Sequence, residues 1–439
     1  MEVMNGQRQT FDGRIWTGHS GEIIPKGRLV IENGKILRVG PIESFSFEPE
    51  GQYCDYSGRT IIPGLIDTHT HPIFGEEGRR YEDYIREDSH HMMLLRASRN
   101  VKLHQAIGVT TLRDSGSVGN VGIALREGIR TGYVTGPRVL TSASPITITG
   151  GHFWWCHGEA DGVEGVRRAV RKRKKQGVDF IKIMASGGGT LGTDPRVASF
   201  TQAELDELVR ESHAHGLRCS AHAEATEAVK RAVKAGVGSI EHAGFQEPDG
   251  TRTYREDIVE MMVEKDLVYS PTIQTAFRQF ESASNGESNP TCKRLKRQSA
   301  HYKLSRKLDN LTKMHQAGVT IIAGSDAIRQ FGDFVLGLEL FVYAGMTAEE
   351  ALQSATSGAA FAIGLEKVTG ALRPGLAADL LVVEGDPLED IRDLRNVVAV
   401  FQGGEQVFIS PRIKALIPDS ERPGANTNIA KVLDITESG

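Results

Sequence analysis

The sequence predicts an α/β protein, a (β/α)8 TIM barrel that carries a small β-sandwich domain built from both chain ends. Strand-like and helical segments alternate through the middle of the chain, which is typical of a parallel sheet. Both chain ends consist instead of short strand-like runs separated by turns. The length of 439 residues exceeds that of most single domains and suits one barrel with a small addition.

The β domain is expected at residues 1–62 and 366–415. Its N-terminal part contains an Asn33-Gly34 pair between two apolar runs, which is a strong hairpin signal and predicts a small antiparallel sheet. The C-terminal part has the same pattern of strand-like apolar runs separated by turns, as in GLAADLLVV and VVAVFQGGEQVF. The tail, residues 416–439, is expected to be weakly ordered.

The barrel is expected at residues 63–365, where eight strand candidates occur. Helical patterns follow most of them, as at 201–216 and 226–236, and eight such units predict a closed barrel. The polar, weakly periodic stretch 278–300 is expected to be a long mobile loop. The strand candidates are residues 65–71, 109–115, 138–144, 180–186, 217–223, 238–244, 267–272 and 319–326.

Composition argues against several classes of partner. The net charge is −4 and the pI is about 6.4, so the chain lacks the basic footprint of a nucleic-acid-binding protein. The basic run 167–177 is most simply a solvated helix face, with a patch for a phosphate or an anionic partner as the alternative. Four scattered cysteines, with no signal peptide and no long apolar span, predict a cytoplasmic protein without a membrane partner.

Lys182 lies in the middle of the apolar run VDFIKIMASGGG. Alternation along this predicted strand places Lys182 beside Phe180 and Met184, with Ile181 and Ile183 on the other face, so neither face looks solvated. A lone ammonium in such a strand is costly, and the residue therefore requires a special explanation.

Histidines and an aspartate recur at the C-terminal ends of the predicted strands, where this fold builds active sites. His69 and His71 are two residues apart, which places both imidazoles on one face of a strand, as two ligands of one ion require. His222, His242 and Asp326 end later strands. Each residue alone has an ordinary packing or capping role as an alternative, but together they predict a metal site.

The motifs PGLIDTHTHP, FIKIMASGG, AHAEA, SIEHAG, AGSDA and GLAADLLVV resemble those of the amidohydrolase superfamily. The texture is most similar to the imidazolonepropionase-like branch, which includes metal-dependent prolidases and related carboxypeptidases. The resemblance covers nearly the whole chain. Its ligand set is specific, whereas the substrate is not specified by it.

The resemblance implies a centre of two divalent ions. His69, His71 and Asp326 would hold one ion, and His222 and His242 the second. Lys182 would be carboxylated by CO₂ and bridge the pair, which would turn a costly buried cation into an anion. Nitrogen and oxygen ligands suit zinc, with manganese, cobalt and iron as alternatives.

The activity that this resemblance implies is hydrolysis of an amide-type C–N bond (amide, peptide-like, carbamate or urea) in a small molecule. The two ions would activate a shared water, and Asp326 would be the general base that passes its proton to the leaving amine. Barrels of this type often self-associate, so a homo-oligomer is expected.

Three further residues are candidates for substrate contact. His152 matches a loop histidine that helps to bind or polarise the substrate carbonyl, and a loop-stabilising hydrogen bond is the alternative. Trp154 and its neighbour Trp155 could form an aromatic wall or pack a lid. Relatives often have a small or aromatic residue at the position of Glu224, where a tyrosine can meet a substrate carboxylate. A glutamate there predicts instead a neutral or cationic substrate edge.

Two rival functions remain open. A metal-dependent deaminase of a heterocycle would use Glu224 to shuttle protons, although such relatives usually carry one metal and lack the lysine of the fourth strand. Their acid follows the fifth-strand histidine by three residues, where this chain has Ala225. A metal-free scaffold is the other rival, and the intact ligand set argues against it.

Overall fold

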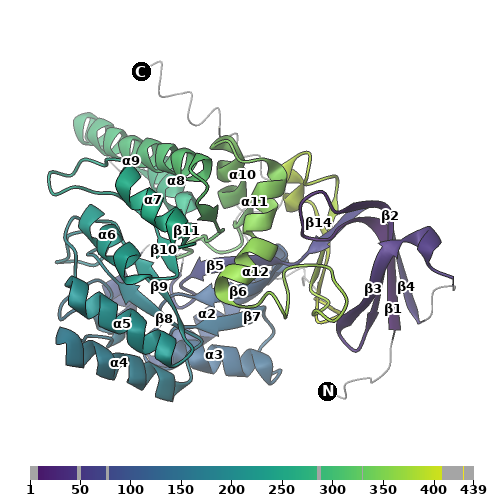
Figure 1. Cartoon of the computed structure of the whole chain (residues 1–439), viewed down its shortest axis with the longest axis horizontal. Coiled ribbons are helices and arrows are strands. Elements are labelled where there is room, and N and C mark those ends of the chain that lie inside the picture. The colour runs from purple at the N-terminus through teal and green to yellow at the C-terminus, as the bar shows by residue number, and fades with distance from the viewer. Residues whose placement is uncertain are drawn as a thin grey trace.

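The computed structural model describes residues 8–46, 51–75, 79–283, 288–328, 330–407 and 429. It is an α/β structure with two parallel sheets and one mixed sheet. Figure 1 shows the mixed sheet at one end of the molecule and the helices gathered around the parallel strands at the other. The predicted tail 416–439 lies outside the described residues except for Ile429.

The mixed sheet has seven strands and draws on both chain ends, as the sequence predicts. The strand order is β15-β14-β13-β4-β1-β2-β3, so the long β4 joins the N-terminal strands to the C-terminal ones. The antiparallel prediction is wrong for one pair, because β1 and β4 run parallel. The seven strands are hydrogen-bonded into one continuous sheet, so the two packed sheets of the predicted β-sandwich are not confirmed. The strands are β1 (Arg8–Trp16), β2 (Ile23–Glu32), β3 (Lys35–Pro41), β4 (Gln52–Pro63), β13 (Leu380–Glu384), β14 (Val397–Gln402) and β15 (Glu405–Gln406).

The predicted Asn33-Gly34 turn joins β2 to β3. Both residues have positive φ, 52° and 73°, as a two-residue hairpin turn of this kind requires. The core of this sheet is apolar and includes Phe11, Leu29 and Leu380, each fully buried.

All eight predicted central strands form, although each is shorter than expected. They make two parallel sheets, ordered β5-β6-β7 and β12-β11-β10-β9-β8. The strands are β5 (Leu65–Thr70), β6 (Val109–Asp114), β7 (Arg138–Thr141), β8 (Phe180–Met184), β9 (Arg218–His222), β10 (Ser239–Glu241), β11 (Val268–Ser270) and β12 (Thr320–Ile321).

Backbone hydrogen bonds join the two parallel sheets at both edges. Beyond β7, the amide of Ile146 donates to the carbonyl of Lys182 in β8 (2.8 Å). Beyond β12, the amide of Asp326 donates to the carbonyl of His69 in β5 (2.7 Å). These hydrogen bonds link the segments beyond β7 and β12 to the neighbouring sheet.

Helices follow the parallel strands, and local sequence signals explain their ends. Thr201 and Glu204 form a capping box at the start of α5. Within the basic run, Val166, Val170 and Arg173 of α4 are buried, whereas Lys172, Lys174 and Lys175 are exposed and Arg171 pairs with Glu211 of α5 at 2.6 Å. Most of the run is therefore an exposed helix face, and Arg173 is the exception. The helices are α1 (Tyr81–Glu87), α2 (His90–Ala106), α3 (Val121–Arg130), α4 (Gly162–Gln176), α5 (Gln202–Ala214), α6 (Thr226–Ala235), α7 (Glu256–Glu264), α8 (Ile273–Ser282), α9 (Pro290–Gln316), α10 (Val335–Tyr343), α11 (Ala348–Ser354) and α12 (Ser357–Ile363), with 3-10 turns η1 (Ile42–Ser44), η2 (Trp154–Cys156) and η3 (Ile391–Arg395).

The prediction of a long loop at 278–300 is wrong. The end of α8 and the start of α9 occupy most of this stretch. The buried positions of α9 begin only at Leu304 and continue with Leu311 and Met314, so its helical period is invisible within 278–300. None of the described helices combines the length and the apolar character needed to cross a membrane.

Candidate functional site

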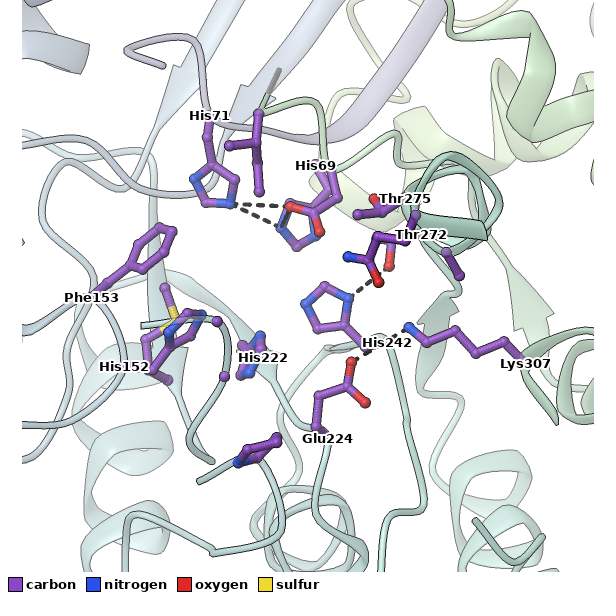
Figure 2. Close-up of a pocket in the computed structure, with 18 of the residues that line it drawn as sticks. His69, His71, His152, Phe153, His222, Glu224, His242, Thr272, Thr275 and Lys307 are labelled. Carbon is purple, nitrogen blue, oxygen red and sulfur yellow. Dashed lines mark hydrogen bonds and ion pairs between the residues drawn. The ribbon is translucent and has the colours of Figure 1, made fainter. Parts of the chain in front are cut away.

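A cavity of about 270 Å³ lies at the C-terminal ends of the parallel strands and is close in scale to small-molecule sites. It brings together all of the predicted metal ligands. Two of the predicted substrate contacts, His152 and Glu224, also line it. Figure 2 shows the imidazoles around a central space. The ligand candidates in the lining are His69, His71, Lys182, His222, His242 and Asp326.

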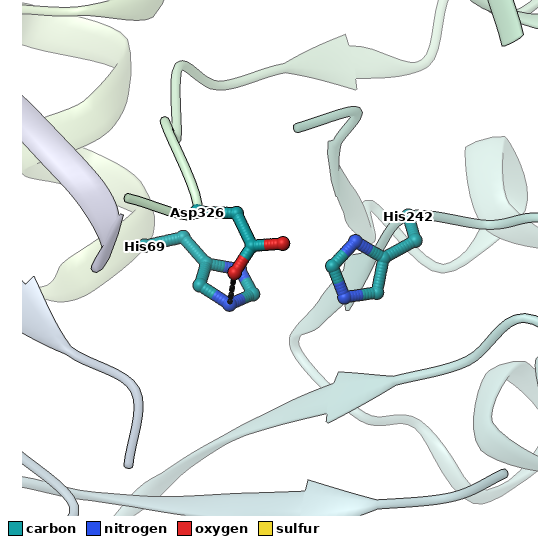
Figure 3. Close-up of side chains that lie close together, drawn as sticks. All are labelled: His69, His242 and Asp326. Carbon is teal, nitrogen blue, oxygen red and sulfur yellow. Dashed lines mark ion pairs between the residues drawn. The ribbon is translucent and has the colours of Figure 1, made fainter. Parts of the chain in front are cut away.

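The ligand atoms are close enough to share ions. Oδ1 of Asp326 lies 3.5 Å from Nε2 of His69 and 3.4 Å from Nε2 of His71. His69, His242 and Asp326 each offer one atom within 4.8 Å of the others (Figure 3). This trio takes members from both of the implied ion sites.

The protein orients each of four imidazoles by a hydrogen bond from one ring nitrogen. The acceptors leave the second nitrogen of each ring with a lone pair for a metal, as is usual for ligating histidines. The bonds run from His69 Nδ1 to Glu241 (2.7 Å), His71 Nδ1 to the carbonyl of Gly116 (3.1 Å), His222 Nε2 to the carbonyl of Gly187 (3.0 Å), and His242 Nδ1 to the hydroxyl of Thr272 (2.6 Å).

The protonation states also suit metal binding, which requires neutral imidazoles and an ionised carboxylate. Burial lowers the pKa of His222 to about 4 and holds the pKa of His242 well below its ordinary value. Burial alone would raise the pKa of Asp326, but neighbouring His69 and His71 outweigh it and lower that pKa.

Lys182 is buried in β8, with 1% of its surface exposed. Its Nζ has no hydrogen-bond partner within the described part of the chain. Burial lowers the pKa of Lys182 to about 8, although the negative charge of Glu241 acts to raise it. A buried, unpartnered amine in a metal-ligand cavity fits a chemically modified lysine better than a packed ammonium.

A fully buried carboxylate, Glu241, supports the site and was missed by the sequence reasoning. It accepts a hydrogen bond from His69 (2.7 Å), another from Arg113 (2.8 Å) and a third from Ser220 (2.6 Å). An acidic residue in the short buried strand before His242 is as anomalous as Lys182, and that signal could have found it. Glu241 fixes the ring and the tautomer of His69.

We expect Glu241→Gln to lower the free energy of unfolding by about 3 kcal/mol, because it leaves the buried Arg113 without its counter-ion. Affinity for zinc should fall by about tenfold or more, since His69 loses its orienting partner. Chemical denaturation and zinc titration measure the two effects. The matched control is Glu127→Gln, which breaks exposed pairs with Arg126 and Arg130 and should cost at most about 1 kcal/mol. Equal behaviour of the two variants would contradict the assigned role.

Asp67 ties the first ligand segment to the last. Its carboxylate accepts from the amide of His69 (3.1 Å), from the amide of Ser325 (3.0 Å) and from Nε2 of His104 (3.1 Å). This fully buried side chain therefore sets the position of Asp326 relative to His69.

Backbone strain concentrates at the same cavity. Asp326, His242 and Thr272 all have positive φ, at 51°, 69° and 48°. Non-glycine residues rarely adopt this conformation, and threonine is among those least suited to it. Such strain, about 1–3 kcal/mol per residue, persists where the surrounding structure imposes it, which is common at functional sites.

His152 lines the cavity, and Thr190 positions its ring. Nδ1 of His152 lies 2.8 Å from Oγ1 of Thr190, which also accepts a hydrogen bond from the amide of Phe153 (3.1 Å). Burial holds the pKa of His152 well below its ordinary value. Gly188 makes room for the ring, since a Cβ there would lie 2.6 Å from Nε2.

Glu224 reaches the cavity, where two cations of the protein face its carboxylate. Arg252 pairs with one of its oxygens at 2.8 Å and Lys307 lies 3.5 Å from the other. Burial would raise the pKa of Glu224, yet these two cations more than offset burial and hold it well below its ordinary value. The glutamate charge is thus already matched within the protein, and it offers no free anionic edge for a cationic substrate.

The tryptophans separate into two environments. Trp154 is 41% exposed and does not line the cavity. Trp155 is buried against Phe74 and Phe153, with ring centroids 5.7 and 4.5 Å away. Phe153 and Tyr81 supply the aromatic lining instead. This placement gives the predicted substrate contact of Trp154 no support.

Comparison with known proteins places this geometry in context. A family model described as the amidohydrolase family matches residues 60–407. Ochratoxinase from Aspergillus niger is 32% identical over 404 residues, covering 83% of this chain and 78% of that protein. Imidazolonepropionase from Geobacillus thermodenitrificans is 24% identical over 407 residues, covering 82% and 84%. Among solved structures, a Xaa-Pro dipeptidase with bound methionine in its active site is 29% identical, with a TM-score of 0.81 over 91% of this chain and all (100%) of that chain.

Proposed function

Since the chain belongs to the amidohydrolase family and is a hydrolase acting on C–N bonds, we propose that it is a binuclear metal-dependent enzyme that cleaves an amide-type bond of a small molecule. The bond is an amide, peptide-like, carbamate or urea linkage. The observation that carries the proposal is Lys182, a buried amine without a hydrogen-bond partner among the described residues, in a cavity lined by four histidines and Asp326 that offer ligand atoms.

The donor set fits two ions, with zinc the metal that its nitrogen and oxygen atoms suit best. His69, His71 and Asp326 would hold one ion, and His222 and His242 the other. Lys182 would bridge them as a carbamate. In forming it, the ammonium first loses a proton to water. The neutral amine then adds to the carbon of CO₂, so that a new N–C bond forms as one C=O π bond breaks, and a second proton leaves the nitrogen. With two protons lost, a cation becomes an anion. The lowered pKa of Lys182, about 8, increases the neutral fraction that this addition needs.

When bound, the ions supply Lewis acidity that polarises the scissile carbonyl and acidifies the attacking water. Asp326 accepts the proton of that water and returns it to the departing amine, a role that its ionised carboxylate suits. His152 donates from Nε2 to the carbonyl oxygen as negative charge develops there. Phe153 and Tyr81 add aromatic surface to the lining of the cavity.

The names of the relatives agree with this reaction class. The Xaa-Pro dipeptidase is by its name an enzyme of a peptide bond, and its structure covers nearly the same length of chain. The deaminase alternative is less well supported, because both oxygens of Glu224 face cations of the protein, Arg252 at 2.8 Å and Lys307 at 3.5 Å.

Three wider expectations belong to the same proposal. We infer that the two parallel sheets are arcs of one closed (β/α)8 barrel, since backbone hydrogen bonds join both pairs of edges. We place the domain boundaries at 62/63 and 365/366, next to the last residue of β4 (Pro63) and just after the last residue of α12 (Ile363). A cytoplasmic location and a homo-oligomer stay predictions, and the second is measurable by sedimentation.

The proposal is tested by metal analysis together with a hydrolysis screen of the metal-loaded protein. The screen uses N-acyl amino acids, dipeptides, aryl amides, carbamates and ureas. We expect bound divalent metal and turnover of at least one class. Protein without metal and without hydrolysis would favour the scaffold alternative, and ammonia release from heterocycles alone would favour the deaminase.

A further inference from the structure

The cavity has a cationic wall, which we define as Arg252, Lys303 and Lys307. In Figure 2, Lys307 lies across the central space from His71 and Phe153. Among the described lining residues, Glu224 is the carboxylate that faces this wall, while Asp326 lies against the histidines. The three positive charges of the cationic wall therefore face the single negative charge of Glu224, which leaves a net positive charge on this side of the cavity.

The pairing within the wall leaves Lys307 with unused capacity. Arg252 is committed: Nη1 lies 2.8 Å from Glu224 and 2.9 Å from the carbonyl of Gly244, to which it donates. Gly244 permits this arrangement, because a Cβ there would lie 2.0 Å from the Glu224 carboxylate. Lys307 lies 3.5 Å from Glu224, beyond the length of about 2.7–2.9 Å typical of a charge-assisted hydrogen bond.

Because two of these cations are buried, their net positive charge indicates that an anion binds beside them. The Lys307 side chain is 4% exposed and that of Arg252 is 7% exposed. Buried cations are unfavourable unless an anion accompanies them. Lys303 is half-buried, and its Nζ donates to the neutral amide oxygen of Gln279 (3.0 Å), so it adds charge without neutralising any.

We infer that the cationic wall binds a free carboxylate of the substrate, with Lys307 as its main contact and Glu224 as the brace that positions Arg252 and Lys307. The inference rests on the proposed function and narrows it to amides that carry a carboxylate, as N-acyl amino acids do. It reverses the expectation of a neutral or cationic substrate edge.

The test compares substrate pairs that differ only in this charge. Metal-loaded protein is assayed for acetate release from a panel of N-acetyl amino acids and from their carboxamides. We expect kcat/KM to favour the acids by about tenfold or more, and Lys307→Met to remove most of that preference. The matched control is Lys293→Met on the exposed part of the same helix, which should leave the preference as it is.

Two further arms complete the test. Lys303→Met, at a half-buried position, should reduce the preference by a smaller factor and serves if Lys307→Met does not fold. Succinyl anilides, with the carboxylate on the acyl side, show which side of the bond faces the wall. Equal rates for acids and carboxamides, or an intact preference in both lysine variants, would overturn the inference.

Failure of the proposed function gives a different result. In that case the wild-type protein hydrolyses neither member of any pair. Calorimetric binding of N-acetyl-L-phenylalanine then decides the carboxylate subsite alone. Weaker binding by Lys307→Met than by Lys293→Met supports the subsite, and equal binding refutes it.

Discussion

Lys182→Ala is expected to lose bound metal and hydrolytic activity together. The side chain is buried, and its Nζ finds no hydrogen-bond partner in the described residues, so an ordinary packing role does not account for it. Removing the bridge should lower turnover by about three orders of magnitude or more, since several kcal/mol of transition-state stabilisation depend on the ions. Metal content by mass spectrometry and steady-state rates measure both effects on one preparation.

Substitutions at two lysines separate the bridge from a mere positive charge. Lys182→Arg keeps the charge but cannot form the carbamate, and it should fail as Lys182→Ala does. Lys307→Met removes the other buried lysine of the same cavity and should retain metal. Acetate or propionate added to Lys182→Ala should restore part of the activity by supplying two oxygens in the vacated space. Normal metal content and turnover in Lys182→Arg would show the assignment to be wrong.

Asp326→Asn should reduce kcat by about 10²–10⁴-fold, because an amide cannot accept the proton of the attacking water. Folding should survive. Asp326 has a φ of 51°, and asparagine is among the few residues that tolerate this left-handed conformation well. Substrate binding, read from KM, should change less than kcat.

The control for Asp326→Asn is Asp266→Asn. Asp266 has the same φ of 51° but lies exposed, away from the cavity, so the pair separates the backbone effect from the chemical one. Thermal unfolding should be unchanged in the control. If Asp326→Asn kept near wild-type kcat, the identity of the base would have to be revised.

The sequence predicts the part of this site that follows from strand periodicity. His69, His71 and Lys182 lie on predicted strands, and the rule that parallel strands present their C-terminal ends to one space is enough to bring them together. The anomaly of a lysine in an apolar strand survives in the structure as a buried amine without a hydrogen-bond partner among the described residues.

The part that could not be predicted depends on contacts between distant segments. Arg252 lies in a loop and Lys307 on α9, whose start falls in a stretch without visible helical period. Nothing local shows that both side chains reach Glu224. The sequence therefore predicts only the negative charge of Glu224 near the cavity, whereas the folded chain places Arg252 and Lys307 beside it. For this reason the substrate that we infer carries a carboxylate and not a neutral or cationic edge.

The measurement that tests the central claim most directly is the hydrolysis rate of metal-free protein as zinc is added back, with bicarbonate present and the best substrate of the screen. The account predicts no turnover without zinc, and a rate that rises until two ions are bound per chain and then stays constant. Full hydrolysis by the metal-free protein, or none with two zinc ions bound, would contradict it.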